Sequence, residues 1–82
     1  MTDPALRAWC LDELASLLNR PVAEIRSDAS FASLGLDSAN SVGFVLALED
    51  RLGLELDPEL LGEYRTLDAL LEHLSADHLR GP

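Results

Sequence analysis

The chain has 82 residues, which is enough for one domain near the lower size at which a chain buries its own core. Nearly half of the residues are hydrophobic (48%), which predicts a packed domain rather than a disordered acidic tail. Six basic and 15 acidic residues give a formal charge of −9. This charge argues against binding to nucleic acid or to anionic membranes, because both require a basic patch. It favours solubility and partners that present positive surfaces.

Cys10 is the single cysteine, so no internal disulfide is expected, and no second cysteine offers metal-ligand spacing. Its apolar neighbours predict a small core residue rather than a reactive thiol. The sequence has no signal peptide, long apolar span or lipidation motif. We therefore expect a soluble, cytoplasmic monomer without a metal site.

A first helix is predicted over residues 4–19. Asp3 is a suitable N-cap, and Pro4 suits the first helical position. Apolar residues then recur at three- and four-residue spacing and form one stripe, at Leu6, Trp9, Cys10, Leu14, Leu17 and Leu18.

Residues 20–37 are predicted to form a long loop, punctuated by Pro21, Asp28, Ser30 and Gly35. Large apolar residues are scattered through it, at Val22, Ile25, Phe31, Leu34 and Leu36. Their presence predicts a segment pinned onto the core rather than a free linker.

A second helix is predicted over residues 38–52, with Gly53 at its C-terminal stop. Its apolar stripe contains Val45, Leu48 and Leu52, whereas Val42 and Leu46 lie partly off the stripe and predict apolar surface facing outward.

A short third helix is predicted over residues 58–62, ended by Gly62. Thr66 caps a fourth helix over 67–78, in which leucines recur at i, i+3, i+4 and i+7. The predicted fold class is all-α: a single domain, residues 1–82, folded as a small four-helix bundle with a long first loop and a short third helix.

Ser38, at the start of the second helix, has three interpretations. It is a good N-cap, but Asp37 before it is an equally good one. If Asp37 is the cap, Ser38 becomes the first helical residue and its hydroxyl is exposed. A phosphate ester on Ser38 would then lie at the positive end of the helix dipole, near unpaired backbone N–H groups.

The second interpretation makes Ser38 a catalytic nucleophile, which requires a base, an orienting acid and a strained turn. The G-x-S-x-G pattern is absent, and the only bases of the right kind, His73 and His78, fall near the end of the fourth helix. We therefore expect no catalytic residues.

The third interpretation comes from a family resemblance. Residues 29–31 read A-S-F, residues 34–38 read L-G-L-D-S, and residues 45–52 read V-L-A-L-E-D-R-L. Two further words are G-L-E-L at 53–56 and R-T-L-D-A-L-L-E-H-L at 65–74. Together these segments resemble the acyl carrier protein family, also called phosphopantetheine-binding domains, over nearly the whole chain.

The resemblance implies that Ser38 receives 4′-phosphopantetheine from coenzyme A through a magnesium-dependent phosphopantetheinyl transferase. The thiol of the arm then holds an acyl or aminoacyl group as a thioester. Acyl-loading, condensing and acyl-transferring enzymes are the implied partners, and the carrier itself is not an enzyme. Asp37 falls in the recognition motif of the family.

The resemblance also implies that partners read the second helix, at Leu36, Ala39, Val42, Gly43, Leu46 and Glu49. Four acidic residues cluster near the third helix and offer a second surface for partners or, alternatively, a solvated face, at Glu55, Asp57, Glu59 and Glu63.

Two residues depart from the family pattern. Ala39 replaces a bulkier aliphatic residue, and Gly43 replaces a glutamate that is common in fatty-acid carriers. As a hypothesis, they mark a carrier adapted to partners other than those of general fatty-acid synthesis. The G-L-D-S sequence departs from the G-G-x-S that is usual in peptidyl carrier domains, and the 65–74 segment looks more like polyketide-type carriers. Since the chain starts at Met1 without a flanking linker, we expect a discrete carrier for polyketide or hybrid nonribosomal-peptide metabolism, although an excised domain would look the same. The alternative is an acidic helical scaffold with the carrier fold that is never modified.

Overall fold

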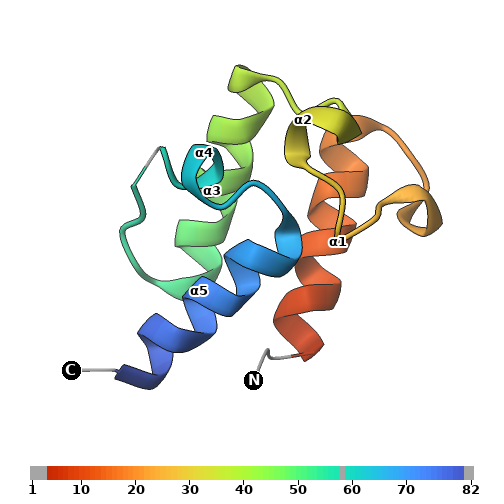
Figure 1. Cartoon of the computed structure of the whole chain (residues 1–82). Helices are drawn as coiled ribbons and strands as arrows, with labels where there is room; N and C mark the ends of the chain where they lie inside the picture. Colours follow the sequence, from red (N-terminus) through yellow and green to blue (C-terminus); the bar gives the residue numbers. More distant parts are fainter. Residues whose placement is uncertain (1–3, 58, 81–82) are drawn as a thin grey trace.

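The computed structural model describes residues 4–57 and 59–80, with the side chains of residues 75–80 excepted. Its elements in chain order are α1 (Pro4–Leu18), the 3-10 helix η1 (Val22–Glu24), α2 (Phe31–Leu34), α3 (Ser38–Leu52), α4 (Leu60–Glu63) and α5 (Leu67–Arg80) (Figure 1). The all-α prediction is confirmed, since the described residues contain helices and no strand. None of the described helices is long and apolar enough to cross a membrane.

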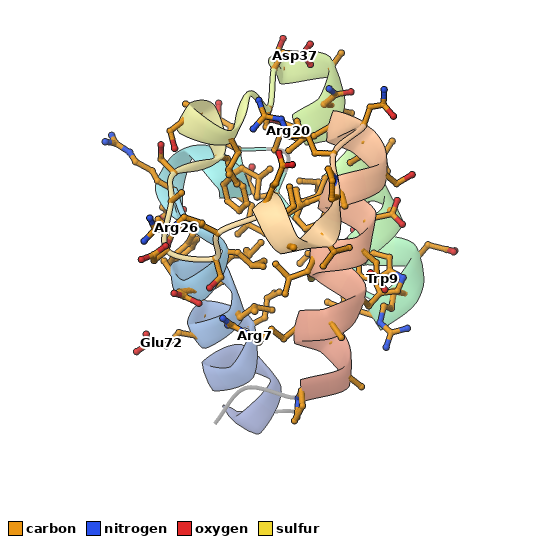
Figure 2. The ribbon with its side chains drawn as sticks, turned by 90° about the vertical axis from the view of Figure 1, so that its right-hand side faces the viewer. Arg7, Trp9, Arg20, Arg26, Asp37 and Glu72 are labelled. Carbon is orange, nitrogen blue, oxygen red and sulfur yellow. The ribbon has the colours of Figure 1, made fainter. Side chains whose placement is uncertain are left out.

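The helices α1 and α3 pack against each other and run in opposite directions. The Trp9 ring in the first half of α1 stacks on Phe44 with 6.5 Å between centroids, and the guanidinium of Arg51 lies 5.3 Å from the Trp9 ring. Further along α1, Leu17 lies against Gly43, nearer the start of α3. The C-terminal end of α1 and the N-terminal end of α3 therefore lie at the same end of the molecule (Figures 1 and 2).

The predicted apolar stripes form the core. Phe44 and Leu48 of α3 are fully buried, and Phe44 also packs on Phe31 with 6.2 Å between ring centroids. In α5 the four predicted leucines are buried, at Leu67, Leu70, Leu71 and Leu74. The predicted cap of this helix is confirmed, because the Thr66 hydroxyl accepts a hydrogen bond from the Ala69 N–H at 3.1 Å.

Two predicted boundaries of the first helix have different outcomes. The helix ends at Leu18 and not at residue 19, because Asn19 adopts the left-handed conformation (φ 55°) that closes a helix C-terminus. Asp3, expected as the N-cap, lies outside the described residues.

The predicted long loop contains two short helices that the sequence analysis missed, η1 and α2. Ser30 caps α2 by accepting a hydrogen bond from the Ser33 N–H, and Gly35 ends it after one turn with φ 99°. A single turn is too short to produce a helical period in the sequence.

The short third helix of the prediction corresponds to α4, which begins at Leu60 rather than at residue 58. It continues through Gly62 to Glu63, so the prediction that Gly62 ends it was wrong. Asp57 accepts a hydrogen bond from the Glu59 N–H in the turn before α4. The fourth predicted helix extends to Arg80, two residues beyond the predicted boundary.

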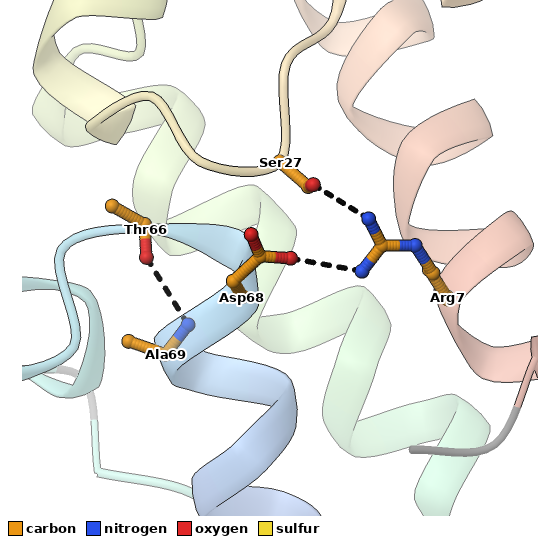
Figure 3. A network of polar contacts seen from close by, with 5 residues as sticks. All are labelled: Arg7, Ser27, Thr66, Asp68 and Ala69. Atoms are coloured by element: carbon orange, nitrogen blue, oxygen red, sulfur yellow. Dashed lines mark hydrogen bonds and ion pairs between the residues drawn. The ribbon is translucent and has the colours of Figure 1, made fainter.

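Polar contacts join the long first loop to α1 and α5 (Figure 3). The Arg7 guanidinium donates to Asp68 Oδ1 at 2.9 Å and to the Ser27 hydroxyl at 2.6 Å. The backbone adds two bonds, from Asp68 N–H to Ser27 O at 3.0 Å and from Phe31 N–H to Arg65 O at 2.8 Å. The prediction of a pinned loop is confirmed, since four of its five large apolar residues are buried, at Ile25, Phe31, Leu34 and Leu36, while Val22 is exposed.

Candidate functional site

Asp37, not Ser38, is the N-cap of α3. Asp37 Oδ1 accepts a hydrogen bond from the Asn40 N–H at 2.7 Å, and its carbonyl oxygen accepts one from the Ser41 N–H at 2.8 Å. The extended backbone of Asp37 (φ −87°, ψ 178°) is typical of an N-cap. Because this position is occupied by Asp37, Ser38 is left as the first residue of the helix.

The Ser38 hydroxyl is exposed and makes no hydrogen bond within the described part of the chain. Nor do the backbone N–H groups of Ser38 and Ala39 have an acceptor there. A phosphate ester on the Ser38 oxygen would therefore stand beside unpaired N–H donors at the positive end of a 15-residue helix. The exposed hydroxyl and the unpaired N–H donors fit a phosphodiester-linked group.

The segment before Ser38 is held from beneath by Leu36. This side chain is only 8% exposed and belongs to the core, and the Leu36 N–H donates to the Phe31 carbonyl at 3.0 Å. Its burial corrects the interpretation of Leu36 as a residue on the outer surface. Its role is to anchor the turn that presents Asp37 and Ser38.

The outer face of α3 near Ser38 carries no charged side chain. Ala39 is exposed, and Val42 and Leu46 expose 48% and 59% of their surfaces. Gly43 is half-buried, and a Cβ built on it would meet only Leu17 Cδ2 at 3.9 Å, an ordinary contact distance. The prediction of outward apolar surface on this helix is confirmed. Leu54, 48% exposed after the end of α3, is a further exposed leucine that helical periodicity did not indicate.

Glu49 differs from the other expected contact residues because its carboxylate is already used within the chain. Its Oε2 accepts a hydrogen bond from the Leu56 N–H at 2.6 Å, and the side chain is half-buried. This bond fixes the segment that follows α3. The acidic cluster after it lines an open depression of about 490 Å³, formed by Asp57, Glu59, Gly62 and Glu63.

Of the two histidines considered as a catalytic base, only the His73 side chain lies within the described residues. The His73 ring stacks on Tyr64 with 4.1 Å between centroids, and the side chain of His78 lies outside the described residues. Cys10 is fully buried, and this burial raises the pKa of its thiol to about 12. Such a thiol is not a ready nucleophile.

Comparison with known proteins agrees with this geometry. The family model for the phosphopantetheine attachment site matches residues 8–74. Polyketide synthase PksM of Bacillus subtilis is 37% identical over 75 residues, which are 92% of this chain but only 2% of that synthase. Acyl carrier protein 3 of Ralstonia nicotianae is 31% identical over 77 residues, 93% of this chain and 88% of that protein.

Among solved structures, the chain is similar to a free-standing peptidyl carrier protein from an uncharacterized secondary metabolic pathway of Acinetobacter baumannii. The TM-score is 0.82 at 35% identity, and the match covers 87% of this chain and 89% of that one. Proteins of this kind are in general carriers rather than catalysts. The chain belongs to the phosphopantetheine-binding carrier family, and its cofactor is a covalently attached 4′-phosphopantetheine.

Proposed function

We propose that Ser38 is the residue that takes the phosphopantetheine arm. The single observation that carries this proposal is the exposed, unbonded Ser38 hydroxyl at the first position of α3, next to an Asp37 that already caps the helix. In the transfer, the Ser38 oxygen forms a bond to the phosphorus of coenzyme A that bears pantetheine. The pyrophosphate bond breaks, 3′,5′-ADP leaves, and the hydroxyl proton goes to a base of the transferase.

The arm holds an acyl or aminoacyl group as a thioester on its thiol and presents it to loading, condensing and acyl-transferring enzymes. This chain supplies the attachment point and the recognition surface and performs no chemistry itself. A polyketide or hybrid pathway is supported by the similarity to a polyketide synthase and to a carrier of a secondary metabolic pathway. We place the protein in the cytoplasm because coenzyme A and acyl-loading enzymes are present there, and we expect it to act as a monomer.

The partner surface in this proposal is the outer face of α3, formed by Ala39, Val42, Gly43 and Leu46. Exposed apolar side chains and two small residues let a partner approach closely at the end that bears Ser38. Glu49 contributes mainly by holding the following segment in place. The hypothesis that Ala39 and Gly43 adapt the carrier to special partners predicts that Gly43→Glu slows acylation by the cognate loading enzyme. An unchanged rate of acylation by the cognate loading enzyme would contradict this hypothesis.

The test is incubation of the chain with coenzyme A, magnesium and a broad-specificity phosphopantetheinyl transferase, followed by intact-mass and fragment-ion spectra. The parent and Ser41→Ala, a matched control one helical turn further along α3, are expected to gain one phosphopantetheine. Ser38→Ala is expected to gain none. No gain in a parent chain shown to be folded would favour the alternative, an unmodified acidic scaffold, and a gain in Ser38→Ala would move the attachment to another residue.

A further inference from the structure

Three arginines of this acidic chain are engaged by other side chains in the described structure. Arg7 is bonded to Asp68 and Ser27, and Arg51 lies over the Trp9 ring. Arg26 pairs with Asp28 at 3.0 Å. Among the arginine side chains of residues 4–74, which the structure describes, the guanidinium groups of Arg20 and Arg65 have no hydrogen-bond, ion-pair or aromatic partner. With 15 acidic residues in the chain, an arginine without a carboxylate partner is unexpected. The position of Arg20 in the fold indicates which anion its guanidinium group can bind.

The backbone at Arg20 is fixed. The Arg20 N–H donates to the Ala15 carbonyl at 3.0 Å and the Asn19 N–H to the Ser16 carbonyl at 3.3 Å, which is the pattern of a closed helix C-terminus. Pro21 follows and restricts the next φ to −62°. The side chain of Arg20 thus starts from a rigid frame at the end of α1.

This frame lies at the end of the molecule that carries Ser38. Leu17 contacts the position of Gly43, and the two helices run in opposite directions, so residues after Leu17 and residues before Gly43 extend the same way. Ser38 precedes Gly43 by five residues, about 7.5 Å along the helix axis, and Arg20 follows Leu17 by three. Figure 2 shows Arg20 just below Asp37 at this end. The two side chains form no ion pair, so the guanidinium donors of Arg20 remain unused.

We propose that Arg20 binds the phosphodiester that joins the phosphopantetheine arm to Ser38. The proposal rests on Ser38 being the attachment residue. The modification adds one negative charge beside the Asp37 carboxylate in a chain of net charge −9, and this repulsion favours a nearby cation. A guanidinium suits a phosphodiester because its parallel N–H groups match two phosphate oxygens. The N–H groups of Ser38 and Ala39 bind the phosphate from the helix side, and Arg20 binds it from the end of α1.

The test compares apo and phosphopantetheine-loaded forms of the parent, Arg20→Gln and Arg65→Gln, each verified by intact mass. Arg65 is the matched control because it too is exposed and without a bonding partner. In low salt, at about 10 mM, where the Debye length is about 30 Å, the phosphodiester 31P resonance of Arg20→Gln should differ from that of the parent. The difference should shrink near 1 M salt, where the Debye length is about 3 Å, and Arg65→Gln should match the parent throughout.

A second measurement is the change in melting temperature when each variant is loaded. Because each variant is compared with its own apo form, any effect of the substitution on folding cancels. Loading should lower the melting temperature of Arg20→Gln more than it lowers that of the parent or of Arg65→Gln, because only the loaded form has the interaction to lose. A parent-like 31P resonance together with equal melting-temperature changes in loaded variants overturns the Arg20 proposal alone. No mass gain on Ser38 in the parent overturns the attachment proposal and this one with it.

Discussion

The carboxylate of Glu49 accepts a hydrogen bond from the backbone N–H of Leu56 at 2.6 Å and so ties the last turn of α3 to the segment leading to α4. A carboxylate acceptor of this kind stabilises by about 1–2 kcal/mol when half-buried, so Glu49→Ala should lower the free energy of unfolding by that amount. Asp50→Ala removes an exposed neighbouring carboxylate and should change it by less than about 0.5 kcal/mol. Chemical denaturation of both variants measures this. Equal effects would show that the Glu49 bond contributes nothing beyond its charge.

Asp37 combines a structural role with a proposed recognition role, and two substitutions separate them. Asp37→Ala removes the cap of α3 and should lower the free energy of unfolding by about 1 kcal/mol, whereas Asp37→Asn keeps a capping oxygen and should stay within a few tenths of the parent. If the transferase recognises the charge, Asp37→Asn should be modified more slowly despite its normal stability. Modification of Asp37→Asn at the parental rate would leave Asp37 with the capping role alone.

Gly43 and Gly53 should respond to alanine in opposite directions. A Cβ on Gly43 has room, with Leu17 Cδ2 at 3.9 Å, so Gly43→Ala should stabilise the helix by about 0.5–1 kcal/mol. Gly53 also has room, but its φ of 68° lies in the left-handed region that alanine rarely adopts, so Gly53→Ala should destabilise by about 1 kcal/mol. Thermal unfolding of the two variants shows whether each substitution raises or lowers the stability. A destabilised Gly43→Ala would mean that α3 depends on close packing at that position.

The Cys10 thiol should resist alkylation while the chain is folded. Burial raises its pKa from 9.0 to about 12, so the unfolded chain ionises at a lower pH than the folded one. The resulting stability is fully present below pH 9.0 and is lost as the pH rises toward 12. Iodoacetamide labelling at neutral pH should proceed only with denaturant, and stability should fall in this alkaline range less steeply in Cys10→Ala. Rapid labelling of the native chain would contradict the burial.

The sequence was informative where one local rule decided the outcome. The outward Val42 and Leu46 follow from positions on a single helix, so the 3.6-residue period predicted them. Capping preference narrowed the N-cap to Asp37 or Ser38, and the structure assigns it to Asp37. The period failed at α2, where one turn between Ser30 and Gly35 contains too few residues to repeat.

The scattered apolar residues predicted that the first loop packs on the core, but the sequence did not indicate which residues form the long-range polar contacts. The sequence predicted two conflicting roles for Leu36, as an apolar residue of the pinned loop and as a partner contact beside Ser38, and its burial agrees with the first. The Glu49 bond to Leu56 and the Arg7 bonds to Ser27 and Asp68 depend on how separate segments meet in three dimensions. The bond to Leu56 therefore adds a structural role for Glu49 that the sequence did not predict, while the partner role of Glu49 and the attachment role of Ser38 stay predictions.

The backbone ties between the first loop and the start of α5 make residues 54–64 an exchangeable cassette. One side of this segment is fixed where Gly53 closes α3, and the other where the Arg65 carbonyl accepts the Phe31 N–H at 2.8 Å. Among the described residues of this segment, Leu60 and Leu61 are buried, and Leu56 and Tyr64 are partly buried against the core, so a replacement has to supply apolar side chains at these four positions. A segment of equal length from another carrier that keeps these four apolar residues, and the backbone N–H at residue 56 that donates to Glu49, should therefore alter the acidic face while leaving the start of α3 and Ser38 in place.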